Sequence, residues 1–143
     1  MDLPPFTDTE QATIARLLHL ADAVRSHLDD VAKTAGVSHA QMTALLALKE
    51  PIPMSQLAEA LSCDRSNITG LIDRLEQQDL VTRREDPADR RVKMLVLTAK
   101  GRKRRAQIQE HVWGRLPNAV GLTDTQLAQL GAILNAKPEE TIL

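Results

Sequence analysis

Apolar residues recur along most of this chain at intervals of three and four positions, the spacing of one face of an α-helix. Over residues 8–33 the two intervals alternate, which gives a narrow seam suited to packing lengthwise against other helices. The seam consists of Ile14, Leu17, Ala21, Val24, Leu28 and Val31. Further helices are predicted over 38–49, 55–61, 65–78, 99–116 and 124–135. In the last of these, the residues expected to be buried are Leu127, Leu130, Ile133 and Leu134.

Polar residues mark where these helices begin. Thr7, Ser38 and Thr123 each stand three residues before a Glu or Gln, the capping-box pattern in which two side chains satisfy free helix amides reciprocally. Simple N-caps are expected at Ser55, Asp64 and Thr98. We expect the 99–116 helix to weaken at Gly114 and Pro117, because proline lacks the amide that a helix interior needs.

Two short segments, "LVTRRE" (80–85) and "VKMLVL" (92–97), flank the turn "DPADRR" and predict a β-hairpin with a longer loop. The order is thus helix, short helix, tight turn, helix, hairpin. This order predicts a winged helix-turn-helix, in which the second helix of the pair enters the DNA major groove. The fold class is mainly α with a small β-hairpin wing, flanked by helices at both ends.

Charge sharpens this prediction. The chain of 143 residues has a formal charge of -1, yet residues 83–105 hold ten Lys or Arg against three Asp or Glu. Part of this excess, Lys100 and residues 102–105, falls in the first turns of a predicted helix. Cations oppose the helix dipole there, which suggests an external anion such as phosphate. The alternative is that these side chains are solvated or meet acidic residues of the first helix.

The exposed face of the 65–78 helix carries the candidate base contacts. Asn can pair with adenine, and Arg can read guanine or hold a phosphate. Arg90 and Arg91 stand at the wing tip, where Arg can enter a narrow minor groove, and Asp89 is expected to pair with one of them. The alternative is a solvated polar face. The predicted DNA-binding residues are Ser55, Arg65, Ser66, Asn67, Thr69, Arg74, Arg90 and Arg91.

The segments "GVSHAQMTALLAL" (36–48) and "LIDRLEQQDLVTR" (71–83) resemble the MarR-type transcriptional regulators. So does the wing "DPADRR" followed by "LT" at Leu97 and Thr98. The resemblance implies a homodimer that binds pseudo-palindromic DNA, usually as a repressor relieved by small apolar or aromatic ligands or by oxidants. It divides a single domain, residues 1–143, into a DNA-binding part at 36–98 and dimerisation parts at 8–34 and 99–136. Gly70 departs from the family, where many relatives carry a larger polar residue.

An effector is expected between the winged part and the helical body. Aromatic residues are limited to Phe6 and Trp113, so we expect a mainly aliphatic lining. Catalysis is not expected, because the chain contains neither a phosphate-binding glycine loop nor a nucleophile elbow. No cofactor or metal is expected either, since none of the four His residues forms a close ligand pair.

The remaining features set the location and the alternatives. No apolar run approaches the roughly 18 residues of a membrane span, and the N-terminus lacks the basic start and apolar core of a signal peptide. We therefore expect a cytoplasmic protein without membrane contact. Two alternatives remain open: a metal- or redox-sensing winged-helix regulator, the latter through Cys63 just before the recognition helix, and a winged-helix module that binds proteins.

Overall fold

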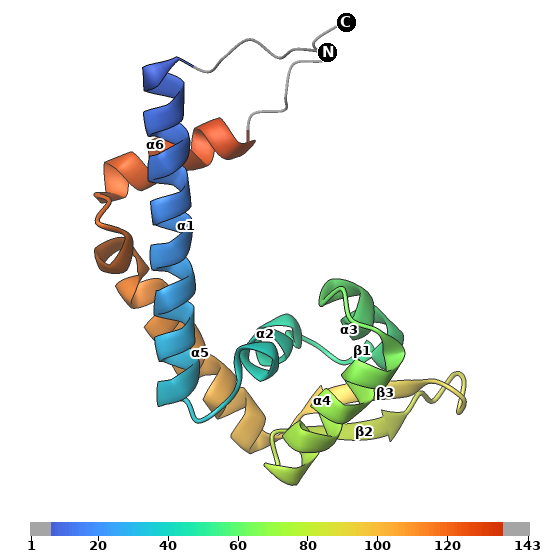
Figure 1. Ribbon diagram of the computed structural model, residues 1–143. Helices are drawn as coiled ribbons and strands as arrows, with labels where there is room; N and C mark the ends of the chain where they lie inside the picture. Colours follow the sequence, from blue (N-terminus) through green and yellow to red (C-terminus); the bar gives the residue numbers. More distant parts are fainter. Residues whose placement is uncertain (1–6, 136–143) are drawn as a thin grey trace, which may run out of the picture.

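The computed structural model describes residues 7–135, and within them it forms an elongated helical arm joined to a compact winged part (Figure 1). The arm is built from α1 and the last two helices, and the winged part from the elements between them. In order, the elements are α1 (Asp8–Thr34), α2 (His39–Ala47), β1 (Ile52–Pro53), α3 (Met54–Ala60), α4 (Arg65–Gln77), β2 (Val81–Glu85), β3 (Lys93–Leu97), α5 (Ala99–Val120) and α6 (Asp124–Asn135). The predicted fold class is confirmed, although the predicted boundary at residue 136 lies outside the described residues.

Reciprocal capping explains why the helices begin where the sequence predicts. At α1 and α2, Thr7 and Ser38 each accept a backbone hydrogen bond from the N3 residue, whose side chain reaches back to the cap amide. Thr123 does the same at α6. At α1, the backbone and side-chain hydrogen bonds from Thr7 hold the pKa of the Glu10 carboxyl below its usual value. The Thr98 hydroxyl accepts from the Gly101 amide at 2.9 Å and caps α5.

Three local expectations are corrected. The cap position of α3 is Pro53, so Ser55 lies inside the first turn. Asp64 does occupy the cap position of α4, but its side chain makes no capping hydrogen bond. The helix expected to end at Leu116 continues through Pro117 to Val120. Proline has a φ angle compatible with a helix, so the backbone of α5 stays helical at Pro117 although that residue has no amide to donate.

The sheet holds the wing in register. Its strand order is β1-β3-β2 and all pairs are antiparallel. The predicted hairpin is confirmed, with Val81 opposite Leu97 at its base and Glu85 opposite Lys93 at its outer end. The third strand, β1, is only two residues long and was not expected. Its residue Ile52 lies opposite Leu95 of the central strand β3, so β1 flanks β3 on the side away from β2.

One aliphatic core lies in the winged part and extends into the arm through α5. Its largest fully buried side chains are Met42, Leu45, Leu48, Leu57, Ile68, Ile72, Leu75, Leu80, Leu95, Ile108 and Val112. Burial of the apolar face of α6 was predicted and is wrong for the single chain, because α6 has no buried residue. The N-terminal half of α1 is also open to solvent, and Leu17 is 48% exposed. The arm therefore presents apolar surface that the single chain does not cover.

Candidate nucleic-acid interface

The α4 helix separates a buried apolar face from an exposed polar one. Its buried residues are Ile68, Leu71, Ile72 and Leu75, which pack into the core at the spacing of one helix face. The residues predicted to touch DNA from this helix are all exposed on the remaining surface: Arg65, Ser66, Asn67, Thr69 and Arg74. The turn before α4 is tight, and Ser62 adopts a left-handed backbone conformation with φ of 49°. Half-buried Cys63 follows it and donates its backbone amide to the Ala58 carbonyl at 2.9 Å.

Part of the predicted site converges on one hollow. Ser55 from α3, Arg65 and Thr69 from α4, and Arg91 and Lys93 from the wing line a hollow of about 500 Å³. The Thr69 hydroxyl donates to the Arg65 carbonyl at 2.9 Å, so its oxygen keeps its acceptor capacity. The structure thus joins three elements at one surface.

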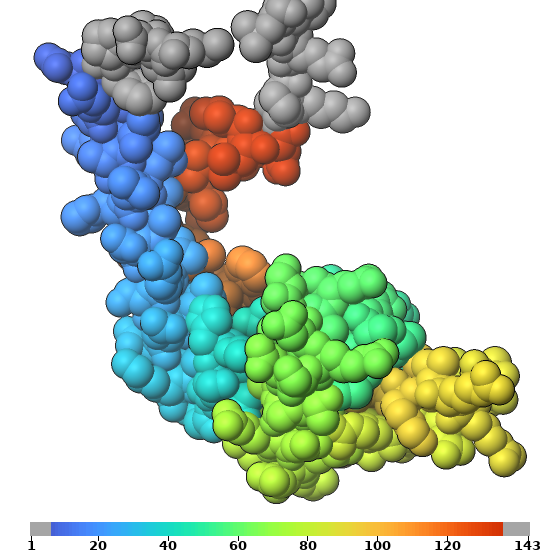
Figure 2. Space-filling model, turned by 45° about the vertical axis from the view of Figure 1, so that its right-hand side comes forward, coloured from blue at the N-terminus to red at the C-terminus, as the bar shows by residue number. Residues whose placement is uncertain are grey.

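The other predicted residues lie beside this hollow without lining it. Ser66, Asn67 and Arg74 are exposed elsewhere on α4, and Arg90 lies on the wing loop. Figure 2 shows the wing as a projection beyond the body of the molecule. The predicted residues therefore occupy two exposed surfaces, the α4 face and the wing, joined at the hollow.

Within the wing, Asp89 has a different partner from the one predicted. Its carboxylate accepts from the backbone amide of Arg91 at 3.0 Å, and its carbonyl accepts from Val92 at 3.0 Å. An ion pair with Arg90 or Arg91 was expected, but within residues 7–135 neither guanidinium has a protein partner. A carboxylate two residues before an amide closes an Asx-type turn. Asp89 thus orders the loop and leaves both arginines open to solvent.

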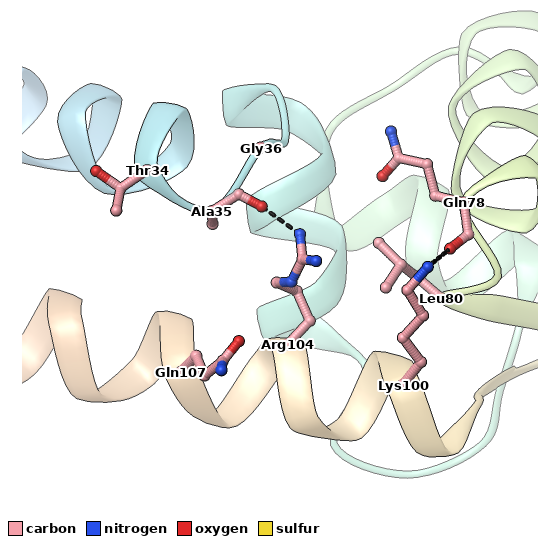
Figure 3. A pocket seen from close by; sticks show the side chains of 8 residues that line it. All are labelled: Thr34, Ala35, Gly36, Gln78, Leu80, Lys100, Arg104 and Gln107. Atoms are coloured by element: carbon pink, nitrogen blue, oxygen red, sulfur yellow. Dashed lines mark hydrogen bonds between the residues drawn. The ribbon is translucent and has the colours of Figure 1, made fainter.

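The cations at the start of α5 have internal partners, which corrects the expectation of an external anion. Lys100 donates to the Gln78 carbonyl at 2.8 Å, and Arg104 donates to the Ala35 carbonyl (Figure 3). Gln78 is the C-cap of α4 and Ala35 is the C-cap of α1. Helix C-termini carry free carbonyls and negative partial charge. The unfavourable position of these cations in α5 is therefore offset by two other helix ends.

Two more cations of this cluster are also engaged. Arg102 donates to the Leu97 carbonyl at 3.0 Å, and Arg105 lies 3.5 Å from the Leu46 carbonyl. Within the described part of the chain, Lys103 is the one member of the cluster without a partner. The cluster thus mainly links the start of α5 to other elements, through hydrogen bonds to their backbone carbonyls.

Sequence reasoning missed the role of Arg83, in β2. Its guanidinium pairs with Asp73 and Glu76 of α4. Among the ten cations of residues 83–105, those with no protein partner in residues 7–135 are Arg84, Arg90, Arg91 and Lys103. Three of these four lie on the wing, so the unpaired positive charge gathers there.

Two further hollows lie away from α4. One, of about 520 Å³, lies at the junction of the winged part and the arm (Figure 3) and is lined by Thr34, Ala35, Gly36, Gln78, Leu80, Lys100, Arg104 and Gln107. A pocket was predicted here with a mainly aliphatic lining, and that lining is wrong, since polar groups predominate. The other, of about 1010 Å³, is a groove between α1 and the α5–α6 region, where Leu17, Leu20 and Leu130 contribute apolar surface.

Other chemistry finds little support in the described residues. In residues 7–135, no three His, Cys, Asp or Glu side chains are grouped so as to hold a metal ion. His27 instead lies 3.1 Å from the Val112 carbonyl, and His39 pairs with Asp29 at 3.2 Å. Over the same part of the chain, no helix combines the length and apolar character needed to span a bilayer.

A helix pair, α3 and α4, followed by the β2–β3 hairpin defines this chain as a winged helix-turn-helix protein. Residues 37–93 match the model of the MarR family, so the winged part of the chain resembles that family. It is 40% identical over 68 residues to the HTH-type transcriptional repressor MdtR of Bacillus subtilis, an alignment covering 46% of this chain and 44% of that protein. The chain spans about half the length of the curated relatives that it matches in sequence.

Solved structures match over a longer range. Sco3205, a MarR family transcriptional regulator from Streptomyces coelicolor solved in complex with DNA, has a TM-score of 0.72 and 27% identity, with 98% of this chain and 96% of that chain covered. CouR from Rhodococcus jostii, solved with p-coumaroyl-CoA, has a TM-score of 0.68 and 26% identity, covering 89% and 92%. The similarity therefore includes the helical arm as well as the winged part.

Proposed function

We propose that this protein is a sequence-specific DNA-binding transcriptional repressor and not an enzyme. The observation that carries the proposal is the pairing of two surfaces. The exposed face of α4 is small and polar near its N-terminus, and the adjoining wing holds Arg84, Arg90 and Arg91 without protein partners in residues 7–135. Such a surface suits a polyanion such as DNA, and the cytoplasm is the proposed place of action.

The two surfaces suit different parts of a duplex. An α-helix with its side chains fills a major groove about 12 Å wide, so α4 can carry Ser66 and Asn67 to base edges. Arg65 and Arg74 flank them with charge for phosphates. Arg90 and Arg91 then reach the neighbouring backbone or minor groove. Ser55 and Thr69 line the hollow between the two surfaces and add hydroxyls for phosphate contacts.

The proposed repressor is a homodimer in which residues 8–34 and 99–136 form the shared body and residues 36–98 form each DNA-binding part. Support comes from the uncovered apolar surface of the arm, where Leu17, Ile133 and Leu134 are exposed in the single chain. A second copy would cover this surface. A two-fold pair of α4 helices would then read a pseudo-palindromic site.

A small effector is the proposed regulator. The hollow at the junction of the winged part and the arm touches the C-terminal ends of α1 and α4, so a ligand there can bias their relative placement. CouR, whose fold this chain shares, was solved with an acyl-CoA ligand. The proposed ligand is a small apolar or aromatic anion, which would share Lys100 and Arg104 of the hollow with the Gln78 and Ala35 carbonyls. A typical coupling to DNA affinity would be about 1–3 kcal/mol.

Selection of bound duplexes from a random DNA pool tests the proposed function. The expected result is enrichment of one pseudo-palindromic sequence whose half-sites lie about one helical turn, roughly 10 bp, apart or a multiple of it. Binding with no enrichment would remove the sequence-specific role. Salt-independent binding would favour the protein-interaction alternative, because phosphate contacts make affinity fall with salt. Metal titration and labelling of Cys63 test the metal- and redox-sensing alternatives.

A further inference from the structure

Arg83 connects the wing to the recognition helix. It lies in the middle of β2, where it pairs with Leu95 of the central strand. One terminal nitrogen of its guanidinium lies 2.6 Å from a carboxylate oxygen of Asp73, and the other contacts Glu76. Its backbone amide also donates to Glu76, at 3.1 Å. One residue of the wing thus makes three polar contacts with α4.

The geometry of this contact favours a fixed arrangement. Asp73 and Glu76 are three residues apart, so both carboxylates lie on the same side of α4. Both oxygens of Glu76 are used, one by the Arg83 amide and one by its guanidinium. Charge-assisted contacts to a planar fork are stronger and more directional than neutral ones. The Arg83 side chain is 26% exposed and that of Glu76 is 30% exposed, so solvent screens this pair only in part.

The contact lies between the two surfaces assigned to DNA. On one side, Asn67 lies on α4 at the exposed start of the helix. On the other, β2 and β3 carry the loop with Arg90 and Arg91. A rigid link between these elements fixes the distance from the α4 face to the wing tip. It also offsets part of the negative charge that Asp73 and Glu76 place on the helix proposed for the major groove.

We propose that Arg83 is a positioning residue for DNA recognition, holding the wing at the angle at which α4 and the wing engage one duplex together. This inference rests on the proposed DNA-binding function. Arg83 acts through Asp73 and Glu76, to whose carboxylates the two terminal nitrogens of its guanidinium donate. Arg84, the next residue, is exposed and has no partner in the described residues, which makes it a matched control.

The test compares Arg83→Gln with Arg84→Gln, using the duplex enriched by the wild-type protein and a random duplex of equal length across a salt series. We expect Arg83→Gln to weaken binding to the enriched duplex about tenfold more than to the random one. Arg84→Gln should weaken both duplexes to a similar degree. Arg83→Lys should not restore discrimination, because one ammonium cannot span two carboxylates as a fork does.

A double-mutant cycle gives a readout that general destabilisation would not move. In an Asp73→Asn, Glu76→Gln background, Arg83→Gln should change discrimination less than about twofold, since its charged partners are already absent. All variants are measured well below their melting temperatures, with dimer content checked by sedimentation. If Arg83→Gln fails to fold, the Asp73→Asn, Glu76→Gln variant alone should show the same loss of discrimination.

The outcomes separate this inference from the proposed function. If the wild-type protein enriches no sequence, the proposed function fails. If it enriches one and Arg83→Gln discriminates as the wild type does, the positioning role is overturned. An equal loss of affinity on both duplexes, with the salt slope reduced by about 0.9, would instead identify Arg83 as a direct phosphate ligand.

Discussion

Two glycines show how much a single residue depends on its neighbours in this fold. Gly101 is buried in the first turn of α5, and a Cβ built there would lie 1.9 Å from the Leu80 carbonyl oxygen. That carbonyl accepts a hydrogen bond from the Thr98 amide at 3.1 Å, so the start of α5 is held against the connection between α4 and β2. Gly70, in the middle of α4, has no atom within 4 Å of its ideal Cβ. The first glycine is required by packing and the second is not.

Alanine at the two positions should therefore have opposite effects. Gly101→Ala should lower the free energy of unfolding by about 1–3 kcal/mol, because backbone must move to admit the methyl group. Gly70→Ala should raise it by about 0.5–1 kcal/mol, because alanine loses less conformational entropy in a helix. Urea unfolding of both variants measures the two values. A stabilising Gly101→Ala would show that α5 does not approach Leu80 this closely.

Asn67 allows a test of base recognition. It is exposed near the start of α4 and its side chain can pair with a base edge. Asn67→Ala should weaken binding to the enriched duplex by about 1–3 kcal/mol and binding to random DNA very little. Fluorescence anisotropy on both duplexes measures the difference. An equal loss of affinity on both would mean that α4 is not the reading helix.

At the residue scale, local patterns were a good guide and distant contacts were not. The polar residues predicted on α4 are exposed because the alternation of apolar positions fixes which face is buried. Arg83 and Lys100 looked like free cations in the sequence. Their partners are backbone carbonyls and carboxylates of other elements, and no local pattern encodes those contacts.

Among the elements, the wing has the clearest separate role. Its hairpin is braced by the cross-strand pair of Lys93 and Glu85 at 3.1 Å, and its loop is ordered by Asp89 and Asp86, whose carboxylates accept backbone hydrogen bonds. The two arginines of the loop are thereby presented on a defined scaffold. Arginines held in this way can contact the phosphates of any duplex, because the phosphate backbone is the same in every DNA sequence.

Removing both wing arginines should weaken binding to most sequences. We expect the Arg90→Ala, Arg91→Ala double variant to bind enriched and random duplexes alike with lower affinity. The slope of log affinity against log salt should fall by about 0.9 for each phosphate that the wing no longer neutralises. The matched control is Arg102→Gln, whose side chain donates to the Leu97 carbonyl and should leave the slope unchanged. An unchanged slope in the double variant would mean that the wing does not touch DNA.

Helix starts and the hairpin could be predicted because their signals are local. Capping boxes at Thr7, Ser38 and Thr123 fix three helix beginnings within a few residues of sequence. The end of α5 was missed because proline is disfavoured inside helices, although its fixed φ angle is compatible with a helical backbone. The sequence correctly indicated which side of α6 is apolar. That side is not buried, because no other part of the single chain covers it.

At the scale of the whole molecule, the described residues present two distinct kinds of surface. Unpaired positive charge gathers on the wing, whereas uncovered apolar surface gathers on the arm. In the arm, Leu17 lies in the seam of α1 and lines the groove toward α5 and α6, while Ile133 is 70% exposed. Burial of such a face against a second copy would remove apolar area from water and stabilise the pair. The arrangement favours a dimer joined at the arms.

A charge placed in the seam should dissociate that dimer. The wild-type protein should sediment as a dimer at micromolar concentration, and Leu17→Asp should shift it toward the monomer. The reason is that an unpaired carboxylate is costly in an apolar interface. Ala88→Asp, on the exposed wing loop, introduces the same charge away from the arm and should remain dimeric. A wild-type monomer at this concentration would contradict the assembly.

The lone thiol of the chain, at Cys63, has a practical consequence for this assembly. It stands just before α4, so a dimer carries one thiol beside each recognition helix. A spin label on each Cys63 would allow the distance between the two α4 helices of the dimer to be measured. Pulsed electron paramagnetic resonance should give a broad distribution of label-to-label distances in the protein without DNA. When the protein is bound to the enriched duplex, this distribution should narrow. Each α4 is then held in a major groove, and the spacing of the two grooves is set by the DNA repeat of about 34 Å.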